Sequence, residues 1–172
     1  MRVTVLALVV VLAALMVPSA LAGKPYRERV PIGTSDDFLP GEACSEAIAP
    51  DGIRLELVGG NEAVMFFEDS GRFMATARHV IEVTNLATGK SVVLNIQGSY
   101  AEVPQADGTA LGRGSGTFGF IFLPGDEGPG DTSTGRYYLF TGTVRLVYDS
   151  SFVVTDFKSN GSMQDVCAMV AS

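Results

Sequence analysis

The sequence has few of the residue types on which most enzymes, zinc proteins and nucleic-acid-binding proteins depend. Its 172 residues include no tryptophan, one histidine and two cysteines, and 18% of them are charged. With 12 basic against 19 acidic residues the formal net charge is −7, so no basic surface is expected for nucleic acid. Two cysteines are too few for a closed zinc site. What is present is a 47% hydrophobic composition over a length typical of about one domain.

The first 22 residues have the layout of a secretory signal peptide. Arg2 supplies a positive charge, an apolar run over residues 3–17 follows, and Ala20 and Ala22 are the small residues that a signal peptidase requires. An apolar run of about 15 residues is shorter than the roughly 20 that a membrane-spanning helix needs. We therefore expect cleavage after Ala22, secretion or retention in the cell envelope, and no stable membrane insertion of the mature chain.

Both cysteines lie in the expected mature chain, Cys44 near its start and Cys167 near its end. An even pair of cysteines in an oxidising compartment most simply forms one disulfide. The predicted bond closes a loop of more than 120 residues. It therefore places the first and last elements of the fold side by side.

The mature chain divides into a short arm and one domain. Residues 23–36 contain Pro25 and Pro31 and show no period of two or of 3.6, which predicts an extended arm. Residues 37–172 are expected to form a single β-rich domain, because apolar and polar residues alternate from Ile53 onward.

The alternation has a period of two over several long stretches. These stretches are 73–84, 92–100, 118–122 and 138–148. Turn signals rich in Gly, Asn and Asp separate them, at 59–61, 69–71, 88–89, 107–108 and 160–161. In the C-terminal tail the alternation stops, and Ser162 is positioned to cap a short helix.

About eight strands joined in sequence, several of them about ten residues long, predict an all-β fold: an antiparallel up-and-down β-barrel with a short C-terminal helix. Closure of a barrel removes edge strands, and a disulfide between the terminal elements fits such closure. A two-sheet β-sandwich with one crossover is the alternative.

Several short segments carry a family resemblance: Cys44, the hairpin sequence 84–96, the approach 112–117 to the Phe-rich strand, and Asp165 to Cys167. Together they resemble small exported β-rich proteins of actinobacteria that have no assigned function, and the resemblance covers most of the mature chain. It implies a bacterial exported protein. The strand order is also similar in architecture to allene-oxide-cyclase and dirigent-like barrels and to lipocalins, whose lumens hold a small apolar molecule.

His79 is the one histidine, and alternation places it on the apolar face of its strand. There it points into the core or lumen, where it could move a proton or anchor a polar ligand group. The simpler interpretation is a buried neutral imidazole satisfied by a neighbouring group. We expect no catalytic residue, and His79 is the candidate if there is one.

Aromatic residues on alternating positions are the remaining candidates for a ligand site, together with His79. They are Tyr100, Phe118, Phe120, Phe122, Tyr138, Phe140 and Tyr148. Packing in the core is the alternative role for most of them.

Two glycine-rich segments could hold an ion or a cofactor. The loop 124–131 contains Asp126, Glu127 and Asp131, which are candidate calcium ligands, but their spacing matches neither an EF-hand nor a glycine-rich nonapeptide repeat, so no metal is expected. Residues 112–116 look like a phosphate cradle, but a strand follows rather than a helix. These glycines are expected to mark a bulge or a bend, and no cofactor is expected.

Three functions stay open. The first is a secreted non-catalytic domain that binds a small apolar ligand or a cell-surface protein. The second is a barrel isomerase, cyclase or hydrolase that uses His79, and the third is an envelope-associated structural protein. A cavity of several hundred Å³ would favour the first two over the third.

Overall fold

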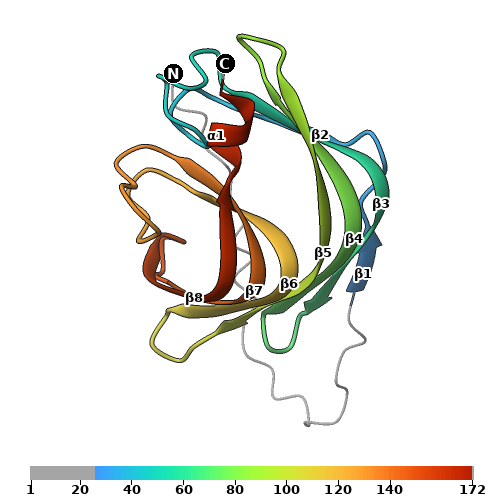
Figure 1. The fold of residues 1–172 in the computed structure, drawn as a ribbon. Helices are drawn as coiled ribbons and strands as arrows, with labels where there is room; N and C mark the ends of the chain where they lie inside the picture. The colour runs from blue at the N-terminus through green and yellow to red at the C-terminus, as the bar shows by residue number, and fades with distance from the viewer. Residues whose placement is uncertain (1–25, 172) are drawn as a thin grey trace, which may run out of the picture.

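A computed structural model describes residues 26–171, whose strands form one strongly bent antiparallel sheet (Figure 1). The strands are β1 (Tyr26–Arg29), β2 (Ser35–Phe38), β3 (Ile53–Phe67), β4 (Arg72–Asn85), β5 (Ser91–Pro104), β6 (Ala110–Phe122), β7 (Arg136–Tyr148) and β8 (Val154–Asp165). The helix α1 (Val166–Val170) follows β8 directly. Among the described residues, no helix has the length and apolarity needed to cross a bilayer. The predicted all-β fold with a short C-terminal helix is confirmed; the predicted signal peptide lies outside the described residues.

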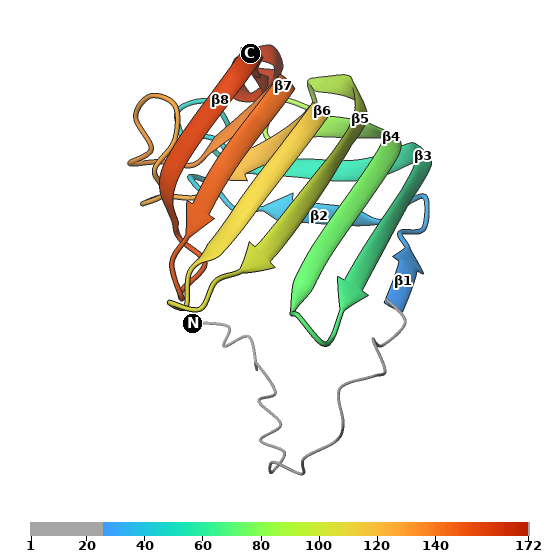
Figure 2. The same ribbon diagram turned by 90° about the horizontal axis from the view of Figure 1, so that it is seen from below.

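Each strand from β3 to β8 pairs with the next one along the chain, and every pairing is antiparallel. The other edge of β3 pairs with both short strands, β1 opposite residues 63–66 and β2 opposite residues 53–56. Figure 2 shows β1 at the β3 side of the sheet, with β8 at the opposite side.

The predicted closed barrel is wrong. Within residues 26–171 no pairing joins β3 to β8, so the sheet stays open. The reason is that β1 and β2 already occupy the edge of β3 that closure would require. Because these strands form a single sheet, the alternative two-sheet sandwich does not describe the fold either. The described part of the predicted arm, residues 26–36, contains the edge strand β1 and the start of the edge strand β2.

A row of glycines crosses the bent part of the sheet. Gly98, Gly116, Gly142 and Gly161 lie directly opposite one another on β5, β6, β7 and β8. The last three have φ values of 95°, 133° and 128°. A Cβ on Gly142 would lie 2.1 Å from the carbonyl oxygen of Asn160, so only glycine fits there. Figure 1 shows β6, β7 and β8 turning sharply partway along their length.

Two of the predicted turns lie inside strands instead. Residues 59–61 belong to β3, whose register shifts between Leu57 and Gly59, and residues 160–161 belong to β8. Gly60 and Gly161 have positive φ, but they use it for a bulge or a bend rather than for a chain reversal.

The disulfide predicted between Cys44 and Cys167 is present, with Cα atoms 5.6 Å apart. Cys44 lies in the irregular segment between β2 and β3, and Cys167 lies in α1. The bond therefore joins the ends of the fold through a loop and a helix rather than through paired strands. The helix cap is Asp165, whose carboxylate accepts a hydrogen bond from the N–H of Ala168 at 3.1 Å. The predicted cap, Ser162, lies within β8.

Asn85, at the end of β4, is fully buried and fastens the same region. Its Nδ2 donates to the carbonyl oxygens of Ile48 at 2.9 Å and of Val170 at 3.2 Å. Its Oδ1 accepts from the N–H of Ala87 at 3.1 Å. One amide side chain thus links the loop that carries Cys44, the end of β4 and the end of α1.

Aromatic rings fill the inside of the bend. The ring of Phe122, which is fully buried, has its centre 5.1 Å from that of Phe157 and 6.3 Å from that of Phe140. Phe157 precedes the glycine row on β8, whereas Phe122 follows it on β6. The bend therefore brings the two halves of these strands into contact with each other, and their aromatic faces form the core.

Candidate functional site

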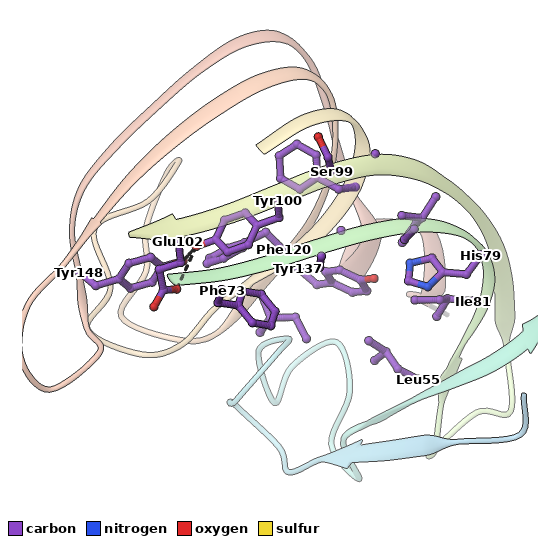
Figure 3. A pocket seen from close by; sticks show the side chains of 17 residues that line it. Leu55, Phe73, His79, Ile81, Ser99, Tyr100, Glu102, Phe120, Tyr137 and Tyr148 are labelled. Atoms are coloured by element: carbon purple, nitrogen blue, oxygen red, sulfur yellow. Dashed lines mark hydrogen bonds between the residues drawn. The ribbon is translucent and has the colours of Figure 1, made fainter. Parts of the chain in front are cut away.

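A cavity of about 450 Å³ opens on the face of the sheet that carries alternate residues of β4 and β5 (Figure 3). Its walls come from β3, β4, β5, β6 and β7. They are largely apolar, with Leu55, Ile81, Ile96 and Ile121 among the lining side chains. A cavity of this size and lining is typical of sites that bind a small apolar molecule.

Small residues at the centre of the sheet leave the room for this cavity. On β4, Ala75 lies opposite Tyr100 and Ala77 lies opposite Gly98, and all four line the cavity. Every second residue of β4 from Phe73 to Ile81 contributes to the wall. The strand alternation predicted from the sequence is therefore correct for β4, and it is the absence of bulk at two alanines and a glycine that keeps the space open.

One end of the cavity carries a chain of hydrogen-bonded polar groups. The hydroxyl oxygens of Tyr100 and Tyr148 lie 2.7 Å apart, and the hydroxyl of Tyr100 lies 3.3 Å from Oε2 of Glu102. Burial raises the pKa of both tyrosines, so both hydroxyls stay protonated at neutral pH. Gly112 makes room for this cluster, because a Cβ there would lie 2.3 Å from the Tyr100 hydroxyl oxygen.

The other end of the cavity carries His79 and Tyr137. His79 was expected to be buried and is half-buried, and its ring faces the cavity between Ile81 and the hydroxyl end of Tyr137 (Figure 3). Tyr137 is 2% exposed, and burial raises its pKa. His79 lies opposite Ile96, which precedes Glu102 by six positions on β5. Six residues of strand span about 20 Å, so His79 and Glu102 mark opposite ends of the cavity.

The cavity gathers some of the predicted ligand-binding residues and leaves others out. His79, Tyr100, Phe118 and Phe120 line it, as does Tyr148. The remaining aromatic candidates pack in the core inside the bend: they are Phe122, Tyr138 and Phe140. The two groups stay in contact, because the ring centre of Phe118 lies 5.6 Å from that of Phe140 and the ring centre of Phe120 lies 4.8 Å from that of Phe122.

Glu102 and Tyr137 are among the cavity residues that were not predicted from the sequence. Glu102 continues the alternation of Ile96, Gly98 and Tyr100, so the period of two was a sufficient signal for it. Tyr137 lies on the opposite face of β7 from Tyr138 and Phe140, and nothing in the sequence indicates that both faces of this strand end are buried.

The acidic loop between β6 and β7 uses its buried carboxylate to hold the chain together. Asp126 accepts hydrogen bonds from the N–H groups of Leu123 at 2.7 Å and of Val154 at 2.9 Å. Glu127 and Asp131 are exposed. Between residues 26 and 171, no three His, Cys, Asp or Glu side chains gather as a metal site would require.

A second hollow, of about 550 Å³, lies on the outer face of the sheet, and most of its lining residues are polar or charged. Arg113, Arg145 and Lys158 lie opposite one another there on β6, β7 and β8. Arg145 forms an ion pair with Asp156, and Nζ of Lys158 is 4.0 Å from the same carboxylate. This exposed, charged surface is unsuited to an apolar ligand, which leaves the inner cavity as the candidate site.

No protein-family model, no curated protein and no solved structure matches the chain.

Proposed function

We propose that this protein is an exported, non-catalytic binding domain that holds a small apolar ligand in the cavity between β4, β5 and the ends of β6 and β7. The observation that supports it is the cavity itself: about 450 Å³, lined mainly by aliphatic and aromatic side chains, with polar groups at its two ends. A structural protein without a ligand would gain stability by filling this space, because close packing is the rule for protein interiors. Export rests on the signal-peptide layout of residues 1–22.

The test uses variants whose larger side chains fill the cavity, and it measures binding of the neutral dye N-phenyl-1-naphthylamine by the fluorescence of the dye. Ala77→Phe places a ring in the centre of the cavity, and we expect the dye affinity to fall at least about tenfold. Ala77→Leu adds less volume, so its loss should be intermediate. The matched control is Thr76→Phe, which adds the same ring on the opposite, exposed face of β4 and should bind the dye like the wild type.

Thermal unfolding of each variant confirms that it is folded under the binding conditions. Equal dye affinity in the wild type, Ala77→Leu and Ala77→Phe would refute the proposal, as would a wild-type protein that binds no dye. Native mass spectrometry of the protein purified from culture medium extends the test, since a co-purifying apolar molecule should be present in the wild type and lost in Ala77→Phe.

Catalysis is the second candidate function, because His79 faces the cavity. An isomerase, cyclase or hydrolase would use this imidazole as its acid or base. The variant His79→Gln separates the two functions. A binding protein should keep its dye affinity within about threefold, whereas an enzyme should keep binding its substrate but lose turnover by 10² or more.

A further inference from the structure

The charge on the lining of the cavity is negative. Among its lining residues there is one carboxylate, Glu102, and no lysine or arginine. The imidazole of His79 is at the far end, about 20 Å of strand away. A ligand with a negatively charged head group would therefore meet no cation at the Glu102 end and would face a like charge instead.

The Glu102 end of the cavity also has more hydrogen-bond acceptors than donors. A tyrosine hydroxyl has one hydrogen to donate, and an ionised carboxylate has none. The short contacts are satisfied together when Tyr148 donates to Tyr100 and Tyr100 donates to Glu102. Both hydroxyl hydrogens are then used. The lone pairs of the Tyr148 hydroxyl and of the Glu102 carboxylate remain, so the end of the cavity can accept hydrogen bonds but cannot donate them.

We infer that the ligand bears a hydrogen-bond donor at one end of an apolar body, and that the cavity ranks head groups in the order ammonium, hydroxyl, carboxylate. The head group lies against Glu102 and Tyr148, and the apolar body extends along β4 and β5 towards Ala77 and Ile81. An ammonium group gains a charge-assisted hydrogen bond to the carboxylate, and a hydroxyl gains a neutral one. A carboxylate head group has no hydrogen to donate to the acceptors of Glu102 and Tyr148, so such a ligand is excluded. This inference rests on the proposed function and adds the class of ligand to it.

The experiment compares three ligands with the same twelve-carbon chain. Dodecylamine, dodecanol and dodecanoate, each below its solubility limit or micellar concentration, compete with N-phenyl-1-naphthylamine for the wild-type protein. We expect the amine to displace the dye at a concentration at least about tenfold lower than dodecanoate, because a charge-assisted hydrogen bond to Glu102 is worth roughly that factor over a neutral one and dodecanoate gains neither. Dodecanol should lie between the two.

The variant Glu102→Gln assigns the preference to the carboxylate. The glutamine oxygen still accepts from Tyr100, so the fold of this end is kept while the charge is lost. The amine should lose about tenfold in affinity, and dodecanol should stay within about threefold of its wild-type value. Glu127→Gln is the matched control, because it removes the same charge from an exposed loop residue outside the cavity. It should leave all three affinities unchanged, which separates the effect of Glu102 from the attraction of amines to a chain of net charge −7.

Dodecanoate binding as tightly as dodecylamine would overturn the inference, as would an amine preference that survives Glu102→Gln or that falls equally in Glu127→Gln. In those cases the dye still binds and is still displaced, so the proposed function stands. A protein that binds neither the dye nor any of the three chains would overturn both.

Discussion

Removing the disulfide should destabilise the folded protein by about 5 kcal/mol. Cys44 and Cys167 are 123 residues apart in the sequence. In the chain-entropy model, a crosslink over a loop of this length lowers the entropy of the unfolded chain by about 16 cal/mol/K, which is about 5 kcal/mol at 25 °C. Small domains have a total stability of roughly 5–15 kcal/mol, so the bond supplies a large fraction of it.

The assay is urea unfolding of the wild type and of the double variant Cys44→Ala, Cys167→Ala, followed by far-ultraviolet circular dichroism. A chain of this size has an m-value of about 2 kcal/mol/M, so the midpoint should fall by roughly 2 to 3 M. Reduced wild type is the control for the two alanines, since its native packing is otherwise unchanged. If the effect arises in the unfolded state, the m-value should rise, because an uncrosslinked chain exposes more surface.

A midpoint shift below about 0.5 M would refute this reasoning. It would mean that Asn85 and the surrounding buried contacts hold the ends of the fold together without the bond.

Three further predictions follow from individual residues. Asn85→Ala should cost about 3 kcal/mol in urea unfolding, because it removes three hydrogen bonds made by a fully buried side chain; a loss below about 1 kcal/mol would contradict this. Gly142→Ala should cost at least about 3 kcal/mol, since the new Cβ meets the Asn160 carbonyl oxygen, whereas Gly89→Ala, with positive φ but open space, should cost about 1 kcal/mol; equal losses would refute the steric argument. Above pH 10 stability should fall by about 1.4 kcal/mol per pH unit for each tyrosine that is ionised in the unfolded chain but still protonated in the native one. Burial raises the native pKa of Tyr100, Tyr137 and Tyr148, so their contribution to the folding stability is complete below pH 10 and is lost above it. Tyrosinate absorbance at 295 nm that develops fully before the protein unfolds would contradict this.

Strand alternation predicts local structure well because it reports burial on one face. The placement of Ala77 and His79 on the cavity side of β4 follows directly from it. The two short strands β1 and β2 could not be found in this way. Three of the four residues of β2 are exposed, and the strand serves to cover an edge of the sheet rather than to bury a face. A strand that only covers an edge does not need alternating apolar residues in its sequence. The alternation of apolar and polar residues therefore could not predict that the sheet is open.

Glycine was ambiguous for a related reason. Positive φ serves both a chain reversal and a bend within a strand, so Asn160-Gly161 looks like a hairpin turn in the sequence. What distinguishes the two is the register of the neighbouring strands. Gly161 lies opposite Gly142, which lies opposite Gly116, and this row exists only once the strands have paired.

The glycine row also explains why a cavity exists in a sheet that does not close. A flat sheet would leave the apolar face of β4 and β5 exposed to water, at a cost proportional to its area. Because β6 and β7 bend at Gly116 and Gly142, their ends turn back, and Ile121 and Tyr137 come to line the same cavity as Ile81 on β4. The bend therefore supplies the wall that barrel closure would otherwise provide. The opposite faces of the same strand ends pack the aromatic core around Phe122, so one bend both stabilises the fold and encloses the site.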